Sequence, residues 1–309
     1  MIIPVIIPVR RPDDSGRAQR ETIRAHARRA LLASGALGHL PTDVAAVMVI
    51  AKATEIPDDV LGNPAFLRRM RKKAGGALRS ALSKVMGLFD AKGGDIFIDR
   101  SLLLVKQTFV RLHEAAHAYL PWQRPMYAVV EDCAQSIDPD VAELFDHEAN
   151  LFASEVLFQL DAFVTEANDR AFDIFVPVNL AKKYGASAYA SIRQYVSKNH
   201  RTCVVVILNP PQLVPNDGFR AALRRVVCSP TFQAQFSRLV WPEQVTPDDN
   251  IGAMVPLGKR RASGKQPIEL IDDNGERHEC LAEAFTQGYQ VFILIHVVRA
   301  LTARTVLVH

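Results

Sequence analysis

The residues best suited to chemistry in this sequence are His113, Glu114 and His117, which form a His-Glu-x-x-His motif. Side chains four residues apart share one face of a helix, so the two imidazoles can bind a single metal ion. The carboxylate of Glu114 lies beside them, where it can accept a proton from water at the metal. Zinc suits this ligand set, and the predicted chemistry is metal-assisted hydrolysis.

A catalytic zinc site needs a third protein ligand, and a second predicted helix offers two candidates downstream. With successive residues about 100° apart around a helix, Asp146 and Asn150 lie together on one edge of the apolar stripe of this helix. Glu148 lies on the other edge. Since only one edge can face the histidines, we expect Asp146 or Glu148, but not both, to bind the metal.

The order of these motifs resembles that of the ImmA/IrrE family of metallopeptidases. A strand pair, the His-Glu-x-x-His helix, a loop and a helix with the pattern D/E-x-E-A-N-x-F-A follow one another, and the last pattern is carried by residues 146–153. The resemblance is strongest over residues 95–160. It implies a zincin-like fold, a Zn²⁺ cofactor and peptide-bond hydrolysis. It also implies that Asp146 is the third ligand, with Asn150 one turn further on as a partner of the ligands.

The sequence departs from the family pattern at three places. Asp146 stands where the family has Glu, and because Asp is one methylene shorter this change bears on metal affinity. Leu157-Phe158-Gln159 replaces a Leu-Met-Pro segment, and Tyr119-Leu120-Pro121-Trp122 follows the first helix in place of a Leu-Leu-His ending. We expect the latter two changes to affect packing only.

The resemblance also implies a biological role. Members of the family are bacterial or mobile-element zinc proteases that cut or inactivate a DNA-binding repressor under stress. The sequence contains no convincing helix-turn-helix segment, so the expected protein substrate is a separate repressor-type transcription factor. The alternative is a non-catalytic regulatory partner that keeps the fold with a weak or structural metal site. The intact Glu114 favours the enzyme, because a structural site needs no base.

Other residues could complete or extend the site. Transition-state oxygens in zinc hydrolases need a donor, and Tyr127, His147 and Tyr119 are near enough in sequence to be candidates. The densest basic stretch, residues 68–79, contains no aromatic side chains, which is typical of a solvated helix face. We therefore do not expect direct binding of nucleic acid.

Hydrophobic periodicity and turn residues predict the elements that hold these side chains. In the N-terminal part we expect helices over residues 17–36, from 41–43 onward, 63–82, 101–119 and 140–168, strands over 85–90 and 95–99, and a loop over 121–139. In the C-terminal part we expect strands over residues 202–208, 291–298 and 304–309, a helix over 219–227 and a polar, basic loop over 258–266.

The predicted fold class is α+β: a helix-rich, zincin-like domain with a small β-sheet over residues 1–175, followed by a C-terminal α+β module over 176–309 that binds substrate or regulates. Residues 1–16 are expected to be an extended arm. The 309 residues carry a net charge of +4 and four cysteines without a CxxC pair, which argues against a disulfide-rich protein. The longest apolar runs are too short to span a membrane, so we predict a cytoplasmic protein without membrane contact.

Overall fold

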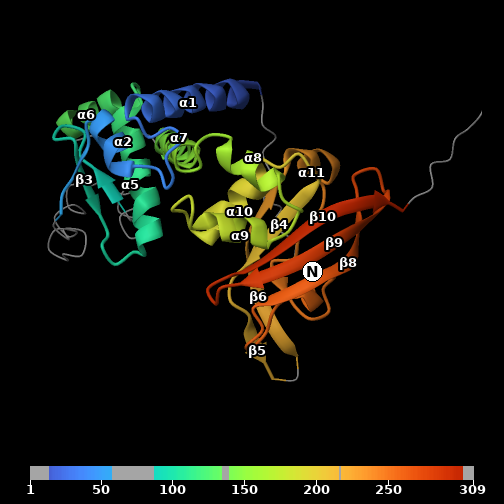
Figure 1. Cartoon of the computed structure of the whole chain (residues 1–309). Helices are drawn as coiled ribbons and strands as arrows, with labels where there is room; N and C mark the ends of the chain where they lie inside the picture. The colour runs from blue at the N-terminus through green and yellow to red at the C-terminus, as the bar shows by residue number, and fades with distance from the viewer. Residues whose placement is uncertain (1–13, 58–86, 134–138, 216, 302–309) are drawn as a thin grey trace, which may run out of the picture. The chain divides into compact units, whose positions relative to one another are not determined.

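The computed structural model describes residues 14–57, 87–133, 139–215 and 217–301 (Figure 1). These residues form two compact units: the helical unit, residues 14–57, 87–133, 139–163 and 181–187, and the sheet unit, residues 164–180, 188–215 and 217–301. The α+β class is confirmed, with a helix-rich N-terminal part around a small sheet and a β-rich C-terminal module. The domain boundary predicted after residue 175 falls within segment 164–180 of the sheet unit.

Several predictions of the sequence analysis concern residues that the structure does not describe. They are most of the extended arm, the helix over residues 63–82 with its basic stretch, and the last strand over residues 304–309. Among the described residues, no helix combines the length and the apolar character that crossing a bilayer requires.

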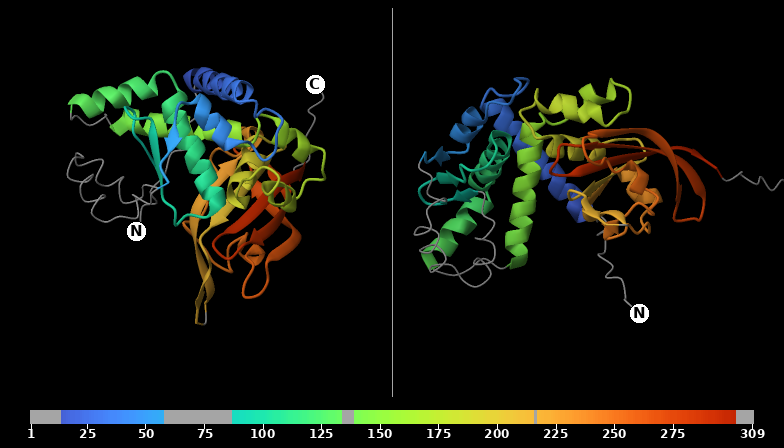
Figure 2. Two further views of the ribbon diagram at one scale, coloured as in Figure 1. Left: turned by 60° about the vertical axis from the view of Figure 1, so that its left-hand side comes forward. Right: turned by 90° about the horizontal axis from the view of Figure 1, so that it is seen from below.

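The helical unit holds the His-Glu-x-x-His motif. Its elements are α1 (Asp14–Ala33), α2 (Val44–Ile50), β1 (Thr54–Glu55), β2 (Gly87–Phe89), β3 (Asp95–Ile98), α5 (Leu104–Tyr119), α6 (Gln123–Cys133) and α7 (Pro139–Leu157). The strands form a sheet in the order β1-β3-β2, in which the predicted strand pair, β2 and β3, is antiparallel and β1 is parallel to β3. Figure 2 shows α5 running beside β2 and β3, and α7 packs against α5 and α1.

A buried apolar cluster fixes α5 on the sheet. Ile96 and Ile98 of β3 pack with Val110 and Ala115 of α5, because alternate residues of a strand point to one face. Arg111, between these two positions around the helix, donates two hydrogen bonds to Glu55 of β1, at 2.7 and 3.0 Å. These contacts fasten α5 to the sheet two residues before the first histidine.

The prediction of a loop over residues 121–139 is wrong for most of that segment, because α6 occupies Gln123–Cys133. Three prolines suggested a loop, but each lies where a helix tolerates it. Pro121 precedes α6, Pro125 lies in its first turn, and Pro139 is the first residue of α7. The backbone N–H groups of a first turn have no partner within the helix, so proline loses nothing there.

The predicted helix over residues 140–168 is two helices, α7 and α8 (Ala162–Asn168). Gln159 and Leu160 between them have φ values of 53° and 60°, which no α-helix accommodates. The buried side chain of Gln159 accepts a hydrogen bond from the Gly38 amide at 2.8 Å and donates one to Thr42 Oγ1 at 2.8 Å. Long-range bonds to the α1–α2 connection therefore accompany the break.

The sheet unit contains an antiparallel sheet in the order β5-β6-β4-β10-β9-β8, with β7 paired to β6. After α9 (Phe175–Ala181), its elements are α10 (Ala188–Ser197), β4 (Cys203–Leu208), β5 (Gln212–Val214), β6 (Gly218–Cys228), α11 (Pro230–Gln235), β7 (Gln244–Val245), η1 (Gly252–Met254), β8 (Ala262–Ile271), β9 (Arg277–Thr286) and β10 (Val291–Ala300). The predicted strands at 202–208 and 291–298 are confirmed as β4 and β10.

Two other predictions for this unit are wrong. Residues 219–227 form strand β6 rather than a helix, although Ala, Leu and Arg favour helices. Alternate residues such as Phe219 and Ala221 are buried against the core, so pairing with β4 and β5 overrides the local preference. The loop predicted for residues 258–266 ends early, because β8 begins at Ala262.

Candidate metal centre

The structure brings together His113, His117 and Asp146. The Nε2 atoms of the two histidines lie 3.1 Å apart, because one turn of α5 separates them. Asp146 reaches them from α7: its Oδ1 atom is 3.8 Å from His113 Nε2 and 3.7 Å from His117 Nε2. The three side chains have been placed by two helices that pack directly on each other.

These three donor atoms fit a zinc ion. A triangle with sides of 3.1, 3.7 and 3.8 Å has a circumscribed circle of about 2.1 Å radius. Zinc bonds to imidazole nitrogen and carboxylate oxygen measure about 2.0–2.2 Å. None of the three atoms has to move for one ion to contact all of them. The carboxylate side of the site is open to water, since the side chain of Asp146 is 64% exposed.

The electrostatic state of both histidines suits metal binding. Burial lowers the pKa of His113 to about 4 and that of His117 to about 4. Both imidazoles are therefore neutral at physiological pH, and a neutral ring nitrogen offers the lone pair that a metal needs. The side chain of Asn150, on the next turn of α7, forms a hydrogen bond with His113.

A buried glutamine determines which nitrogen of His117 carries the proton. Nδ1 of His117 lies 2.7 Å from Oε1 of Gln123. The Gln123 amide nitrogen donates to the main-chain oxygen of Phe145 and, at 2.5 Å, to Glu148 Oε2, so its oxygen is left to accept. His117 thus donates from Nδ1 and keeps Nε2 unprotonated, facing His113 and Asp146.

Glu148 contacts other side chains rather than the two histidines. Its buried carboxylate accepts hydrogen bonds from Gln123, from Trp122 Nε1 at 2.7 Å and from the Gln19 side chain of α1. These bonds join α7 to α1 and to the start of α6. Of the two carboxylates that the sequence offered, Asp146 lies at the histidine nitrogens and Glu148 supports Gln123.

Glu114 lies in a dry environment against strand β2. The side chain is 7% exposed, and burial, with a contribution from the nearby charge of Asp146, raises the pKa of Glu114 to about 8. Gly87 of β2 passes so close that a Cβ atom there would lie 2.6 Å from Glu114 Oε1 and 2.5 Å from Val110 Cγ1. The absence of a side chain at residue 87 makes room for the carboxylate.

The three side chains predicted as hydrogen-bond donors to a transition-state oxygen lie in different places. Tyr127 of α6 lies at the site, where its ring centre is 5.2 Å from that of His117. Burial and the neighbouring carboxylates raise the pKa of the Tyr127 phenol, so it stays protonated. Tyr119 packs instead against Phe152 and His26. His147 is exposed on α7.

Comparison with known proteins relates the segment that holds this site to a peptidase family. Residues 74–192 match the model of the peptidase M78 family, described as the IrrE N-terminal-like domain. This segment is therefore similar to that domain, and we call it the IrrE-like domain. No curated protein matches the chain. A solved Mycobacterium tuberculosis transcriptional regulator covers 90% of this chain and 76% of its own length, with 12% identity and a TM-score of 0.50, which shows a shared fold.

Two residues of the IrrE-like domain were missed by sequence reasoning. The hydrogen-bonding role of Gln123 was hidden because the segment after the motif helix read as a proline-rich loop. Gly87 was taken only as part of a strand. The one available signal was Trp122, an aromatic residue with a polar N–H next to the motif helix, but it was interpreted as a packing residue.

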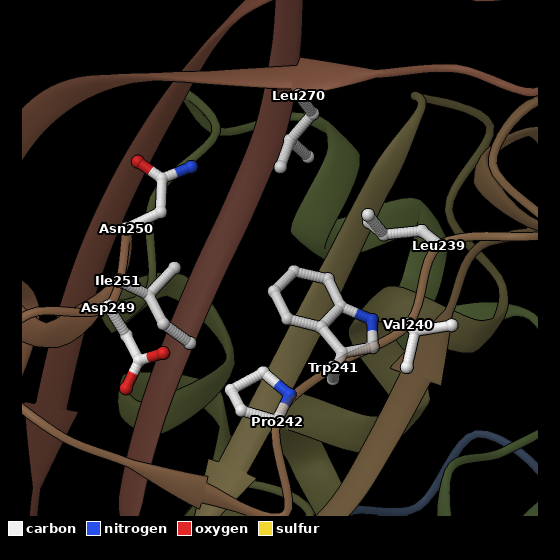
Figure 3. A pocket seen from close by; sticks show the side chains of 8 residues that line it. All are labelled: Leu239, Val240, Trp241, Pro242, Asp249, Asn250, Ile251 and Leu270. Atoms are coloured by element: carbon white, nitrogen blue, oxygen red, sulfur yellow. The ribbon is translucent and has the colours of Figure 1, made fainter. Parts of the chain in front are cut away.

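The sheet unit contains a small pocket outside the IrrE-like domain (Figure 3). Its volume is about 140 Å³, and Trp241, Pro242 and Leu270 form its apolar wall. Two of the polar side chains that line it make hydrogen bonds. Asp249 accepts two from Thr246, at 2.6 and 2.9 Å, and the Asn250 amide donates one to the Glu269 carbonyl at 2.9 Å.

Proposed function

We propose that the protein is a zinc-dependent endopeptidase of the ImmA/IrrE type. The single observation that carries this proposal is the convergence of His113, His117 and Asp146, whose donor atoms lie 3.1–3.8 Å apart, a spacing that one zinc ion can bridge. Glu114, the neighbour of His113 in sequence, is close enough to be affected by the charge of Asp146. The match of residues 74–192 to a peptidase family supports it. The protein would act in the cytoplasm on a protein substrate, a repressor-type transcription factor. The transcriptional regulator among the structural neighbours is compatible with such a role.

The site residues would divide the work as follows. His113, His117 and Asp146 would hold the ion, which when bound supplies Lewis acidity that polarises a carbonyl and acidifies water. Glu114 accepts the proton of the attacking water and passes it to the leaving amine. Its buried carboxylate is a strong base for this task once a positive charge nearby keeps it ionised.

Two groups would assist without touching the ion. Tyr127 keeps its proton and can donate it in a hydrogen bond to the developing oxyanion of the substrate. Gln123, held by Glu148, keeps His117 in the tautomer whose Nε2 lone pair is free. Glu148 is thus proposed to act on the metal site through Gln123 rather than as a ligand.

Substitution of Glu114 by Gln tests the enzyme against the non-catalytic alternative. Gln keeps the shape of the side chain but cannot take a proton, so we expect Glu114→Gln to retain zinc while cleavage of a cognate repressor falls by roughly 100- to 10,000-fold. Zinc content and cleavage are measured on the same preparations. A variant that binds zinc and cleaves at the wild-type rate would refute the proposed mechanism.

A further inference from the structure

Three arginines and a tyrosine gather where α10 packs on β6 in the sheet unit. Tyr189 and Arg193 lie one turn apart on α10, and the Arg193 guanidinium carbon is 5.4 Å from the centre of the Tyr189 ring. Arg224 of β6 approaches the same ring, at 6.0 Å. The positive charge of Arg225, also on β6, acts directly on Arg193. We call these four residues the arginine cluster.

A β-bulge brings two consecutive arginines to this place. In the pairing of β6 with β4, Leu223 lies opposite Leu208 and Arg225 opposite Ile207, which leaves Arg224 as the extra residue. Such a bulge re-aims side chains that would otherwise alternate between the two faces. Arg224 consequently lies over the Tyr189 ring of α10, and the charge of Arg225 repels that of Arg193 on the same helix. Leu223, by contrast, packs on the apolar core.

The arginine cluster has no opposite charge to balance it within the described part of the chain. Neither Arg193 nor its two neighbours on β6 forms an ion pair there, whereas Arg220 of the same strand pairs with Asp217 at 3.3 Å. Arg193 Nε is buried without a hydrogen-bond partner. Burial and the charge of Arg225 lower the pKa of Arg193. Like charges held together in this way destabilise a fold unless an anion joins them.

We propose that the arginine cluster binds a phosphate group. Guanidinium groups hold tetrahedral oxyanions with paired, charge-assisted hydrogen bonds, and three of them match the charge and the several oxygens of a phosphate. The Tyr189 ring, which also packs against Phe292 at 6.2 Å, gives Arg193 and Arg224 a fixed surface to stack on. The proposal is independent of the peptidase, because every residue in it belongs to the sheet unit. The phosphate can come from a small molecule or from a nucleic-acid backbone.

Thermal unfolding of the full-length protein tests this site. Sodium phosphate and sodium chloride are compared at equal ionic strength, with a short DNA duplex as the second source of phosphate. We expect phosphate or DNA to raise the wild-type Tm by about 2–4 °C more than chloride does. Arg225→Gln should lose this gain, and in chloride it should be at least as stable as wild type, because a repulsion has been removed.

Arg220→Gln is the matched control, because it removes one exposed positive charge from the same strand. Phosphate or DNA should raise the Tm of this variant by as much as that of wild type. Arg224→Gln, a substitution at a second exposed position of the arginine cluster, should lose the Tm gain as Arg225→Gln does. An increase in Tm with DNA alone would show that the bound phosphate belongs to a nucleic-acid backbone. An increase with inorganic phosphate would show that it belongs to a small ligand. Equal gains in wild type and Arg225→Gln, or no gain from either ligand, would overturn the proposal.

Discussion

The described part of the chain contains two clusters of histidine with carboxylates, one in each unit, and they differ in what the carboxylate already binds. In the helical unit, Asp146 lies 3.7 and 3.8 Å from the nitrogens of His117 and His113, beyond hydrogen-bond distance. In the sheet unit, Asp272 lies 3.0 Å from His278 Nε2 and also accepts the amides of Asn274 and Glu276, each at 2.9 Å.

The difference teaches that residue types alone do not make a metal centre. Asp272 stabilises the hairpin turn between β8 and β9 and the imidazole of His278, so its oxygens are occupied. The donor atoms of His113, His117 and Asp146 lie 3.1–3.8 Å apart, so one ion can contact all three. We therefore propose that the first cluster binds metal and that the second stabilises a turn, although the carboxylate of Glu276 lies close enough to join Asp272 and His278 as a third ligand.

Removing a histidine from each cluster tests this comparison with the largest expected effect. His117→Ala, like His113→Ala, should weaken zinc binding by roughly 1000-fold or more, because only one imidazole nitrogen then remains beside the carboxylate. His278→Ala should leave the zinc affinity unchanged. Chelator competition measures both. Weaker binding in His278→Ala than in His117→Ala would reverse the assignment of the clusters.

Because Glu114 is buried away from water, we predict that its carboxyl group lowers the stability of the metal-free protein as the pH rises. The pKa of Glu114 is about 8 in the fold against an ordinary 4.5, so its contribution to stability is present below pH 4.5 and is lost as the pH rises toward 8. Metal-free Glu114→Gln should therefore be more stable than wild type at pH 8, by on the order of 3 kcal/mol.

Urea unfolding at pH 5 and pH 8 measures this difference in the free energy of unfolding. The advantage of Glu114→Gln should shrink at pH 5, where the wild-type carboxyl keeps its proton in the fold. It should also shrink when zinc is added, because a nearby cation favours the carboxylate. An advantage of the same size at both pH values would show that Glu114 is not perturbed by its surroundings.

The two carboxylates of α7 sharpen the comparison within the helical unit. Asp146→Ala removes a proposed ligand and should weaken zinc binding roughly 100-fold. Glu148→Ala removes only the support of Gln123, for which about 10-fold is expected. Because Glu148 also satisfies buried donors of Trp122 and Gln19, Glu148→Gln is measured as the milder variant. The opposite ranking in a zinc titration would make Glu148 the ligand.

The contact between β2 and the motif helix predicts the smallest effect. A methyl group at residue 87 meets Val110 and the carboxylate of Glu114, so Gly87→Ala should displace the base and lower kcat roughly 10-fold with zinc affinity retained. Gly264→Ala is the control, since a Cβ there meets nothing within 4 Å. Wild-type kcat in Gly87→Ala would show that the position of Glu114 is not restricted by β2.

Helical spacing in the sequence was sufficient to predict the arrangement of side chains that lie on a single helix. The spacing of His113 and His117 fixes their common face, and helix phase alone separated Asp146 from Glu148. The strand pair before the motif was also predictable, because its hydrophobic pattern and its Gly-Gly turn agree with the tertiary structure.

Long-range contacts explain what could not be predicted. Gln123 is functional only because α7 brings Glu148 to it, and no pattern within residues 121–139 signals that contact. The break after α7 involves the bonds of Gln159 to the α1–α2 connection. Residues 218–228 become a strand because β4 and β5 pair with them, against the helical preference of Ala, Leu and Arg.

X-ray absorption at the zinc edge of the loaded wild-type protein tests the central claim most directly. We predict one zinc ion per chain, bound by two imidazole nitrogens and otherwise by oxygen, with bonds of about 2.0–2.2 Å. Asp146→Ala should keep the two imidazoles and lose affinity. Sulfur in the coordination shell, a third imidazole, or a protein that retains no zinc after loading would contradict the account.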